Sequence, residues 1–276
     1  MNVTETEVTE TIEEEDVSID LPEPTSYPFA ISDGDYAYNE NDNYNFKLSS
    51  SSILTPLSDK VSAGVISLKT YLADNAGKVI NLTGFYDSTE TNNSAFPNLG
   101  LARANVVKNH FVENGISSSQ INTIGELRSL IPKDDIFLGP ISYGISDKTE
   151  NADDELQALY DKITANPLVL YFDTGEAAIT LSAEQRQKVA EISRYLDKVD
   201  GATAQVIGHT DNSGQRATNI VLGQKRADFA ANYLGQNGIS SEKIITSSKG
   251  QNVPVASNAT EEGKAKNRRT IITLKK

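Results

Sequence analysis

The strongest constraint in this sequence of 276 residues is an internal repeat with a period of 124 residues. Segments beginning at Gly84 and Gly208 both place Gly-x-x-Asp at the end of an apolar run, with the acidic residue at Asp87 or Asp211. Each segment then reaches Leu-Gly-x-x-Arg-Ala and, 11 residues after that Arg, Asn-Gly-Ile-Ser. This period is too long for a solenoid unit and suits a duplicated domain. We therefore predict two related domains.

Secondary-structure signals are clearest in the second copy. Leu168–Phe172 is a short β-rich apolar run, and Ser182 opens a capping box before a helix with one apolar face. The second helix is expected to end at Gly238. The first helix is expected to bury Val189, Ile192, Leu196 and Val199, and the second helix Ala227, Ala230, Ala231 and Leu234. The remaining strands are expected at Ala204–Gly208, Lys243–Ser247 and Arg269–Leu274.

The order β-α-β-α-β-β predicts an α+β fold, in which each copy forms a mixed sheet with its helices packed on one face. We expect the first copy to repeat this order from Phe46 to about Ile145. The predicted organisation is an acidic disordered or extended tail at 1–45, a degenerate first domain at 46–146, a polar linker at 147–166 and a second domain at 167–276.

Charge supports a tail at the N-terminus. The formal net charge is −13, and residues 1–46 contain 13 acidic and no basic residues, so the remainder of the chain is neutral. Low hydrophobicity with charge of one sign cannot offset the entropy lost on ordering. The acids from Asp33 to Asp42 lack the spacing of an EF-hand loop. An acidic chain repels phosphate backbones, so we expect no nucleic-acid partner.

The residue types present argue against an enzyme, a metal site or a cofactor. The chain has no Cys and two His, and it contains no phosphate-binding Gly-rich loop. His209, Asp211 and Ser213 are the residue types of a catalytic triad, but they alternate along one strand. A strand sets such side chains beside one another rather than in the relay that a triad needs. No apolar run reaches the length of a membrane span and no signal peptide is recognisable, so we expect any membrane anchor to lie outside this chain.

Asp211 and Arg226 are the candidate binding pair. Asp211 follows a strand and Arg226 lies in the first turns of the next helix, which returns over that strand. The two side chains can therefore meet at one rim of the sheet. A carboxylate accepts hydrogen bonds from an ammonium group, and a guanidinium group grips a carboxylate with two bonds, so the pair suits a zwitterionic ligand. A purely structural ion pair is the alternative that spacing alone leaves open.

The second copy resembles the peptidoglycan-binding domain of the OmpA-like family, which includes peptidoglycan-associated lipoprotein and flagellar stator proteins. The resemblance covers about residues 168–276. Lys264 departs from it, because the family usually has Arg there. In the matching motif, Thr210-Asp211 is followed after ten residues by Leu222-Gly223 and after two more by Arg226-Ala227. The closing segment that ends in Asn267-Arg268-Arg269 also matches the family.

The resemblance implies non-covalent binding of the diaminopimelate in the peptidoglycan stem peptide. Asp211 would hold the amino group and Arg226 the carboxylate, while Arg268 and Arg269 would brace the fold. Other positions implied in the site are Asn219, Leu222, Thr210, Thr174 and Gly175.

The first copy departs further from the family pattern. Tyr86-Asp87 replaces Thr-Asp, Phe96-Pro97 reshapes the loop, and one residue is inserted before Arg103. Asp87 and Arg103 are therefore expected to form a degenerate site, with a spacer or a partner-binding surface as the alternative role.

The resulting expectation is a periplasmic protein of a Gram-negative bacterium that anchors the outer membrane or envelope to peptidoglycan. One alternative is a structural component of a stator- or secretion-type envelope complex, defined by a protein partner. Another is an accessory of a cell-wall hydrolase. The oligomeric state, including a homodimer, is left open.

Overall fold

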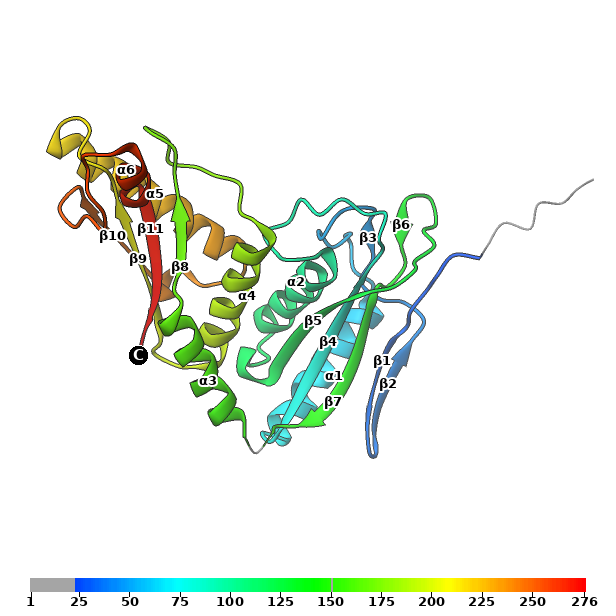
Figure 1. Ribbon diagram of the computed structural model, residues 1–276. Helices are drawn as coiled ribbons and strands as arrows, with labels where there is room; N and C mark the ends of the chain where they lie inside the picture. Colours follow the sequence, from blue (N-terminus) through cyan, green and yellow to red (C-terminus); the bar gives the residue numbers. More distant parts are fainter. Residues whose placement is uncertain (1–22, 150) are drawn as a thin grey trace, which may run out of the picture.

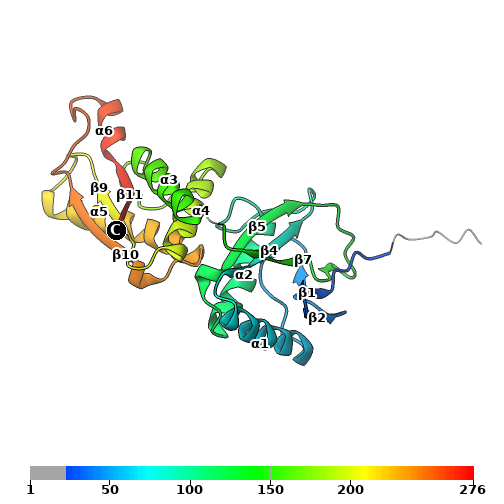
Figure 2. The ribbon, with the colours of Figure 1, turned by 90° about the horizontal axis from the view of Figure 1, so that it is seen from below.

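The computed structural model describes residues 23–149 and 151–276, and the predicted tail at 1–22 lies outside these described residues. The chain forms two α+β regions that lie side by side (Figures 1 and 2). Their largest clusters of buried apolar side chains are separate, one in each region. The prediction of an α+β fold with mixed sheets is confirmed for both regions.

The sheet of the first region has three strands in the order β5-β4-β7. The central strand β4 pairs in parallel with β5 and antiparallel with β7. Helices α1 and α2 contribute apolar side chains to its core. The elements are β1 Phe29–Asp33, β2 Tyr36–Glu40, β3 Phe46–Lys47, α1 Asp59–Asp74, β4 Lys78–Tyr86, α2 Leu99–Glu113, β5 Ile121–Leu127, β6 Ile136–Phe137 and β7 Ile141–Asp147, with a short 3-10 helix at Ser118–Gln120.

The expected extent of the N-terminal tail is wrong for residues 29–45. Strands β1 and β2 form an antiparallel hairpin around Gly34, whose positive φ of 58° suits a tight turn. The side chains of Phe29, Ile31 and Tyr44 are buried in the first core. The prediction followed the acidic composition of the segment and overlooked its short alternating apolar pattern. That pattern gives the hairpin one apolar face, which packs on the core.

The sheet of the second region has the order β10-β9-β11-β8. Strand β9 is parallel to β10 and antiparallel to β11, the same relation that β4 has to β5 and β7. Helix α5 packs along β9 and β10. The elements are β8 Leu168–Tyr171, α4 Ala183–Lys198, β9 Thr203–His209, α5 Arg216–Gln236, β10 Ile244–Gly250, α6 Glu261–Asn267 and β11 Arg269–Lys275, with a short 3-10 helix at Ser241–Lys243.

The helix and strand predictions for the second copy are confirmed to within a few residues. The capping box is present: the Ser182 side chain accepts from the Gln185 backbone N–H, and the Gln185 side chain accepts from the Ser182 N–H. Helix α6 was not predicted, because the seven residues of Glu261–Asn267 are too few to show a periodic apolar face.

The predicted linker contains helix α3, Ala152–Ala165. This helix packs on α4 and β11, and its Ile163 side chain is buried in the second core. Residues 152–165 therefore pack with the second region rather than serving as a free spacer.

In both regions a glycine on the central strand touches a glycine on the following helix. A Cβ atom on Gly84 would lie 1.9 Å from the carbonyl oxygen of Gly100, and one on Gly208 would lie 1.8 Å from that of Gly223. No side chain fits in either place. Because of these contacts the helix lies close to the strand, and its next turn, which contains Arg103 or Arg226, lies at the rim of the sheet.

Candidate functional site

The candidate site lies at the rim of the second sheet where β9 ends. Arg226 projects from α5 and is fully buried. Its Nε donates to the Glu176 carbonyl at 2.8 Å, and its terminal nitrogens donate to the carbonyls of His209 at 2.9 Å and Asp173 at 3.0 Å. The guanidinium carbon also lies 5.0 Å from the centre of the Phe172 ring. Burial lowers the Arg226 pKa to about 10.

Asp211 is paired with Arg268, so the alternative of a structural ion pair between Asp211 and Arg226 is not what the structure shows. One carboxylate oxygen accepts from the Ser213 backbone N–H at 2.9 Å, and the other accepts from Arg268 at 3.0 Å. Arg268 is placed by its Nε, which donates to the Phe172 carbonyl at 3.0 Å. Burial disfavours the charged Asp211, but the bonds from Ser213 and Arg268 outweigh it and lower its pKa.

Arg268 is the functional candidate that sequence reasoning missed. Its only signal was the pair of Arg residues before the last strand, which was assigned to the fold. Arg226, Arg268 and Asp211 together bring two guanidinium groups and one carboxylate to the rim, so these three side chains sum to a charge of +1. Three of the five N–H donors of Arg226 are used by carbonyl groups, and no ion pair joins this side chain to a carboxylate within residues 23–149 and 151–276.

Two of the predicted polar side chains hold the loop rather than facing an open site. The Asn219 side chain donates to the carbonyls of Asp211 and Ser213 and to the Gln251 side chain, at 3.3, 3.0 and 2.6 Å. Thr210 donates to the Asp211 carbonyl at 2.8 Å. Both side chains are therefore positioned to keep the loop after β9 in one shape.

The other three predicted positions differ in exposure. Leu222 is partly buried on α5. Thr174 and Gly175 are exposed in the loop after β8, and Gly175 has a φ of 79°. The flanking carbonyls of Asp173 and Glu176 are the ones that accept from Arg226, so this loop covers the guanidinium group.

At the corresponding rim of the first region, Asp87 and Arg103 do not form an ion pair with each other either. Asp87 accepts from the N–H groups of Thr89 at 2.9 Å and Leu130 at 3.0 Å, and these bonds lower its pKa. The buried Arg103 pairs with Glu90, whose oxygens lie 2.9 and 2.5 Å from its two terminal nitrogens. Asp87, Glu90 and Arg103 together bring two carboxylates and one guanidinium group to this rim, so these three side chains sum to a charge of −1.

His209 has no triad arrangement with its neighbours. Its side chain is buried, and Nδ1 has no hydrogen-bond partner among the described residues. Burial lowers the His209 pKa to about 4, and the nearby charges of Arg269 and Lys249 act in the same direction. The imidazole is therefore neutral near neutral pH, and Asp211 uses its oxygens on Ser213 and Arg268.

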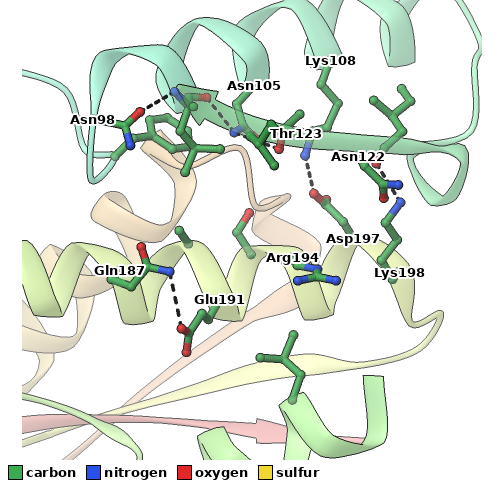
Figure 3. Close-up of a pocket in the computed structure, with 18 of the residues that line it drawn as sticks. Asn98, Asn105, Lys108, Asn122, Thr123, Gln187, Glu191, Arg194, Asp197 and Lys198 are labelled. Atoms are coloured by element: carbon green, nitrogen blue, oxygen red, sulfur yellow. Dashed lines mark hydrogen bonds and ion pairs between the residues drawn. The ribbon is translucent and has the colours of Figure 1, made fainter. Parts of the chain in front are cut away.

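A cavity of about 650 Å³ lies between the two regions, where α4 faces α2 and β5 (Figure 3). Its polar lining is engaged internally. Lys108 pairs with Asp197 across the gap. Lys198 donates to the carbonyls of Ser118, Ser119 and Ile121. The amides of Asn98, Asn105 and Asn122 bond to neighbouring groups of the first region. These contacts identify a polar interface between the regions.

Comparison with known proteins identifies the second region. Residues 171–268 match the model of the OmpA family. The peptidoglycan-binding protein ArfA of Mycobacterium tuberculosis is 36% identical over 120 residues, which cover 44% of this chain and 36% of that protein. The probable lipoprotein YiaD of Escherichia coli is 37% identical over 115 residues, covering 41% of this chain and 52% of that protein.

A crystal structure of the peptidoglycan-associated lipoprotein from Burkholderia pseudomallei is 26% identical, with a TM-score of 0.36, and covers 39% of this chain and 89% of that one. The chain spans about a third to a half of the length of ArfA and YiaD. By its description ArfA binds peptidoglycan, consistent with a non-enzymatic binding domain.

Proposed function

We propose that the second region binds peptidoglycan through the diaminopimelate of the stem peptide. The observation that carries the proposal is the rim of +1 charge, in which Asp211 and Arg226 occupy the two positions of the OmpA-like motif and Arg226 has no carboxylate partner among the described residues. An ammonium group of the ligand would bond to Asp211. Its carboxylate would bond to Arg226 and Arg268.

Binding at Arg226 requires a change at the loop after β8. Arg226 is fully buried, and the carbonyls of Asp173 and Glu176 occupy two of its edges. We propose that residues 173–176, all exposed, move aside so that the ligand carboxylate replaces these carbonyls. Thr174 and Gly175 would then contact the ligand, while Asn219, Thr210 and Leu222 shape the pocket.

The test is co-sedimentation of the purified chain with peptidoglycan sacculi. The Asp211→Ala variant is expected to lose at least about tenfold in affinity, as is usual when one partner of a buried charge contact is removed. Asp87→Ala, the same change at the corresponding place in the first region, is the matched control and should bind as the parent does. Free diaminopimelate should compete with sacculi for the parent.

Circular dichroism and thermal unfolding must show that each variant is folded. Sedimentation of folded Asp211→Ala at the level of the parent would contradict the proposed site. Failure of the parent to sediment would contradict peptidoglycan binding itself and favour the alternative, a structural component of an envelope complex defined by a protein partner.

We also propose that the first region is a degenerate copy of the second. The three strands β5-β4-β7 match β10-β9-β11 in order and direction, and the paired glycine contacts and the matching positions of Arg103 and Arg226 support the proposal further. Both guanidinium groups donate to the carbonyl of the residue two before the rim aspartate, Phe85 or His209. The domain limits 46–146 and 167–276 are part of this proposal, with the hairpin added to the first domain and α3 to the second.

A location in the cell envelope agrees with the relatives. The relatives come from organisms as different as Escherichia coli and Mycobacterium tuberculosis, so they do not decide the type of envelope. We propose a Gram-negative periplasm, with anchoring of the outer membrane. Within residues 23–149 and 151–276, none of the helices combines the length and apolarity that a membrane crossing needs.

A further inference from the structure

The side chain of Glu90 fills a complete carboxylate site in the first region. It is fully buried, and its two oxygens accept four hydrogen bonds. Two come from Arg103, at 2.9 and 2.5 Å. The others come from the backbone N–H groups of Ser49 at 2.8 Å and Asp87 at 3.0 Å. A guanidinium fork with two converging N–H groups is an arrangement that recognises a planar carboxylate.

The guanidinium group that binds the Glu90 carboxylate is also held by other groups. Arg103 also donates from Nε to the Ser50 carbonyl at 3.0 Å and from a terminal nitrogen to the Phe85 carbonyl at 2.9 Å. Its guanidinium carbon lies 5.5 and 5.3 Å from the ring centres of Phe46 and Phe137. Removal of the Glu90 carboxylate therefore leaves the guanidinium group anchored and the cavity lined with donors.

The loop explains why Glu90 can reach this place. In the first region the loop from β4 to α2 runs from residue 87 to 98, and the helix starts where the Asn98 side chain caps it by accepting from the Leu101 N–H. In the second region the loop from β9 to α5 covers only residues 210–215. The longer loop has room to fold Glu90 back onto Arg103.

We propose that Arg103, with the N–H groups of Ser49 and Asp87, forms a binding site for small carboxylates that Glu90 occupies within the same chain. A tethered carboxylate acts at an effective concentration of roughly millimolar or more, so it excludes external carboxylates at ordinary concentrations. The site thus stays closed to the carboxylates of peptidoglycan in the intact chain. This inference is independent of the function proposed for the second region.

The test uses acetate as the probe. Replacing Glu90 by Ala removes a CH₂–COO⁻ group, which matches acetate in size and charge. Thermal unfolding of the full chain is followed at pH 7 against increasing sodium acetate, with sodium chloride holding the ionic strength constant. Acetate should raise the melting temperature of Glu90→Ala saturably, by roughly 3 °C or more, because it binds the folded state alone.

Three controls make the result specific. The parent should not respond to acetate, because Glu90 fills the site. Glu126→Ala, which removes a surface carboxylate paired with Arg128 at 2.8 Å, should not respond either. Pivalate has the charge of acetate but is too bulky for the cavity and should not stabilise Glu90→Ala.

Equal responses of the parent and Glu90→Ala, or equal effects of acetate and pivalate, would overturn the proposal. If Glu90→Ala is unfolded without additives, acetate must restore its cooperative transition where chloride does not. Failure to restore it would also overturn the proposal.

Discussion

The two sheet rims present the same aspartate and arginine with opposite local charge. In the second region, Asp211 is joined by Arg226 and by Arg268, which comes from the segment just before β11. In the first region, Asp87 and Arg103 are joined by Glu90 from the long loop. One rim is left with an excess guanidinium group and the other with an excess carboxylate.

The binding properties of each rim therefore depend on a third charged side chain, Arg268 or Glu90, as much as on the aspartate and arginine of the motif. An arginine that donates to backbone carbonyls can exchange them for a ligand carboxylate. An arginine already held by an internal carboxylate cannot do so at low ligand concentration.

The largest difference is expected on removing the guanidinium groups. Arg103→Met leaves Glu90 buried without its partner, which should cost about 3 to 5 kcal/mol of unfolding free energy. Arg226→Met should cost less, since it leaves three carbonyls unpaired but no unpaired carboxylate, Asp211 keeping Arg268. Urea unfolding measures both losses.

The double variant Arg103→Met/Glu90→Leu is the control, because it removes both charges and should recover much of the lost stability. Equal losses in the two single variants would contradict the contrast between the rims.

Close helix–strand contact should make Gly208→Ala and Gly84→Ala similarly destabilising, by roughly 3 kcal/mol. In each case the new methyl group meets a backbone carbonyl, at 1.8 or 1.9 Å, so that the helix must shift. Gly235→Ala is the matched control: it lies exposed in α5 with open space around its Cβ position, and should gain about 0.5 to 1 kcal/mol. Denaturant unfolding that found Gly208→Ala neutral would contradict the packing.

His209 should make stability depend on acid. Its pKa is about 4 in the folded chain and near 6.5 when unfolded, so the unfolded state binds protons first as the pH falls. Stability is then greatest above pH 6.5 and should fall by about 2 to 3 kcal/mol towards pH 4. The lowered pKa of Asp211 acts in the same direction, but below its ordinary value of 3.8.

His209→Phe is the matched change, since Phe85 occupies the corresponding place before Asp87. Its stability should vary much less between pH 6.5 and pH 4 in urea unfolding. An unchanged pH dependence in this variant would show that other groups cause the effect.

The smallest expected effect concerns helix caps. Ser182→Ala removes the Ser half of a capping box and should cost about 1 kcal/mol. Ser58→Ala, at the start of α1, removes a single long bond of 3.3 Å to the Val61 N–H and should cost somewhat less. Thermal unfolding of the two variants compares them, and a larger loss for Ser58→Ala would reverse the expected ranking.

Much of the fold could be predicted because local patterns decide it. Short apolar runs, the capping box at Ser182 and the stop near Gly238 place the elements of the second region correctly. The hairpin at residues 29–40 was missed, since only one of its faces is apolar and the surrounding composition is acidic. The packing of α3 on the second region was missed because a polar amphipathic helix does not show which core receives it.

The site was predicted in part. The sequence placed Asp211 and Arg226 at one rim, because a strand end and the first turns of the following helix meet there. Spacing alone left a structural ion pair between the two open as an alternative, and the structure instead pairs Asp211 with Arg268. The partner is far away in the sequence, and no local spacing indicates it.

Local sequence sets the order of the elements, the positions of the rim aspartates and arginines, and the glycines that let helix and strand touch. These follow from short-range rules of periodicity, capping and steric size. The charge at each rim arises when the folded chain brings distant segments together. That charge depends on which distant segment reaches the arginine: the antiparallel insertion of β11 between β9 and β8 brings Arg268 to Asp211, and the long loop returns Glu90 to Arg103.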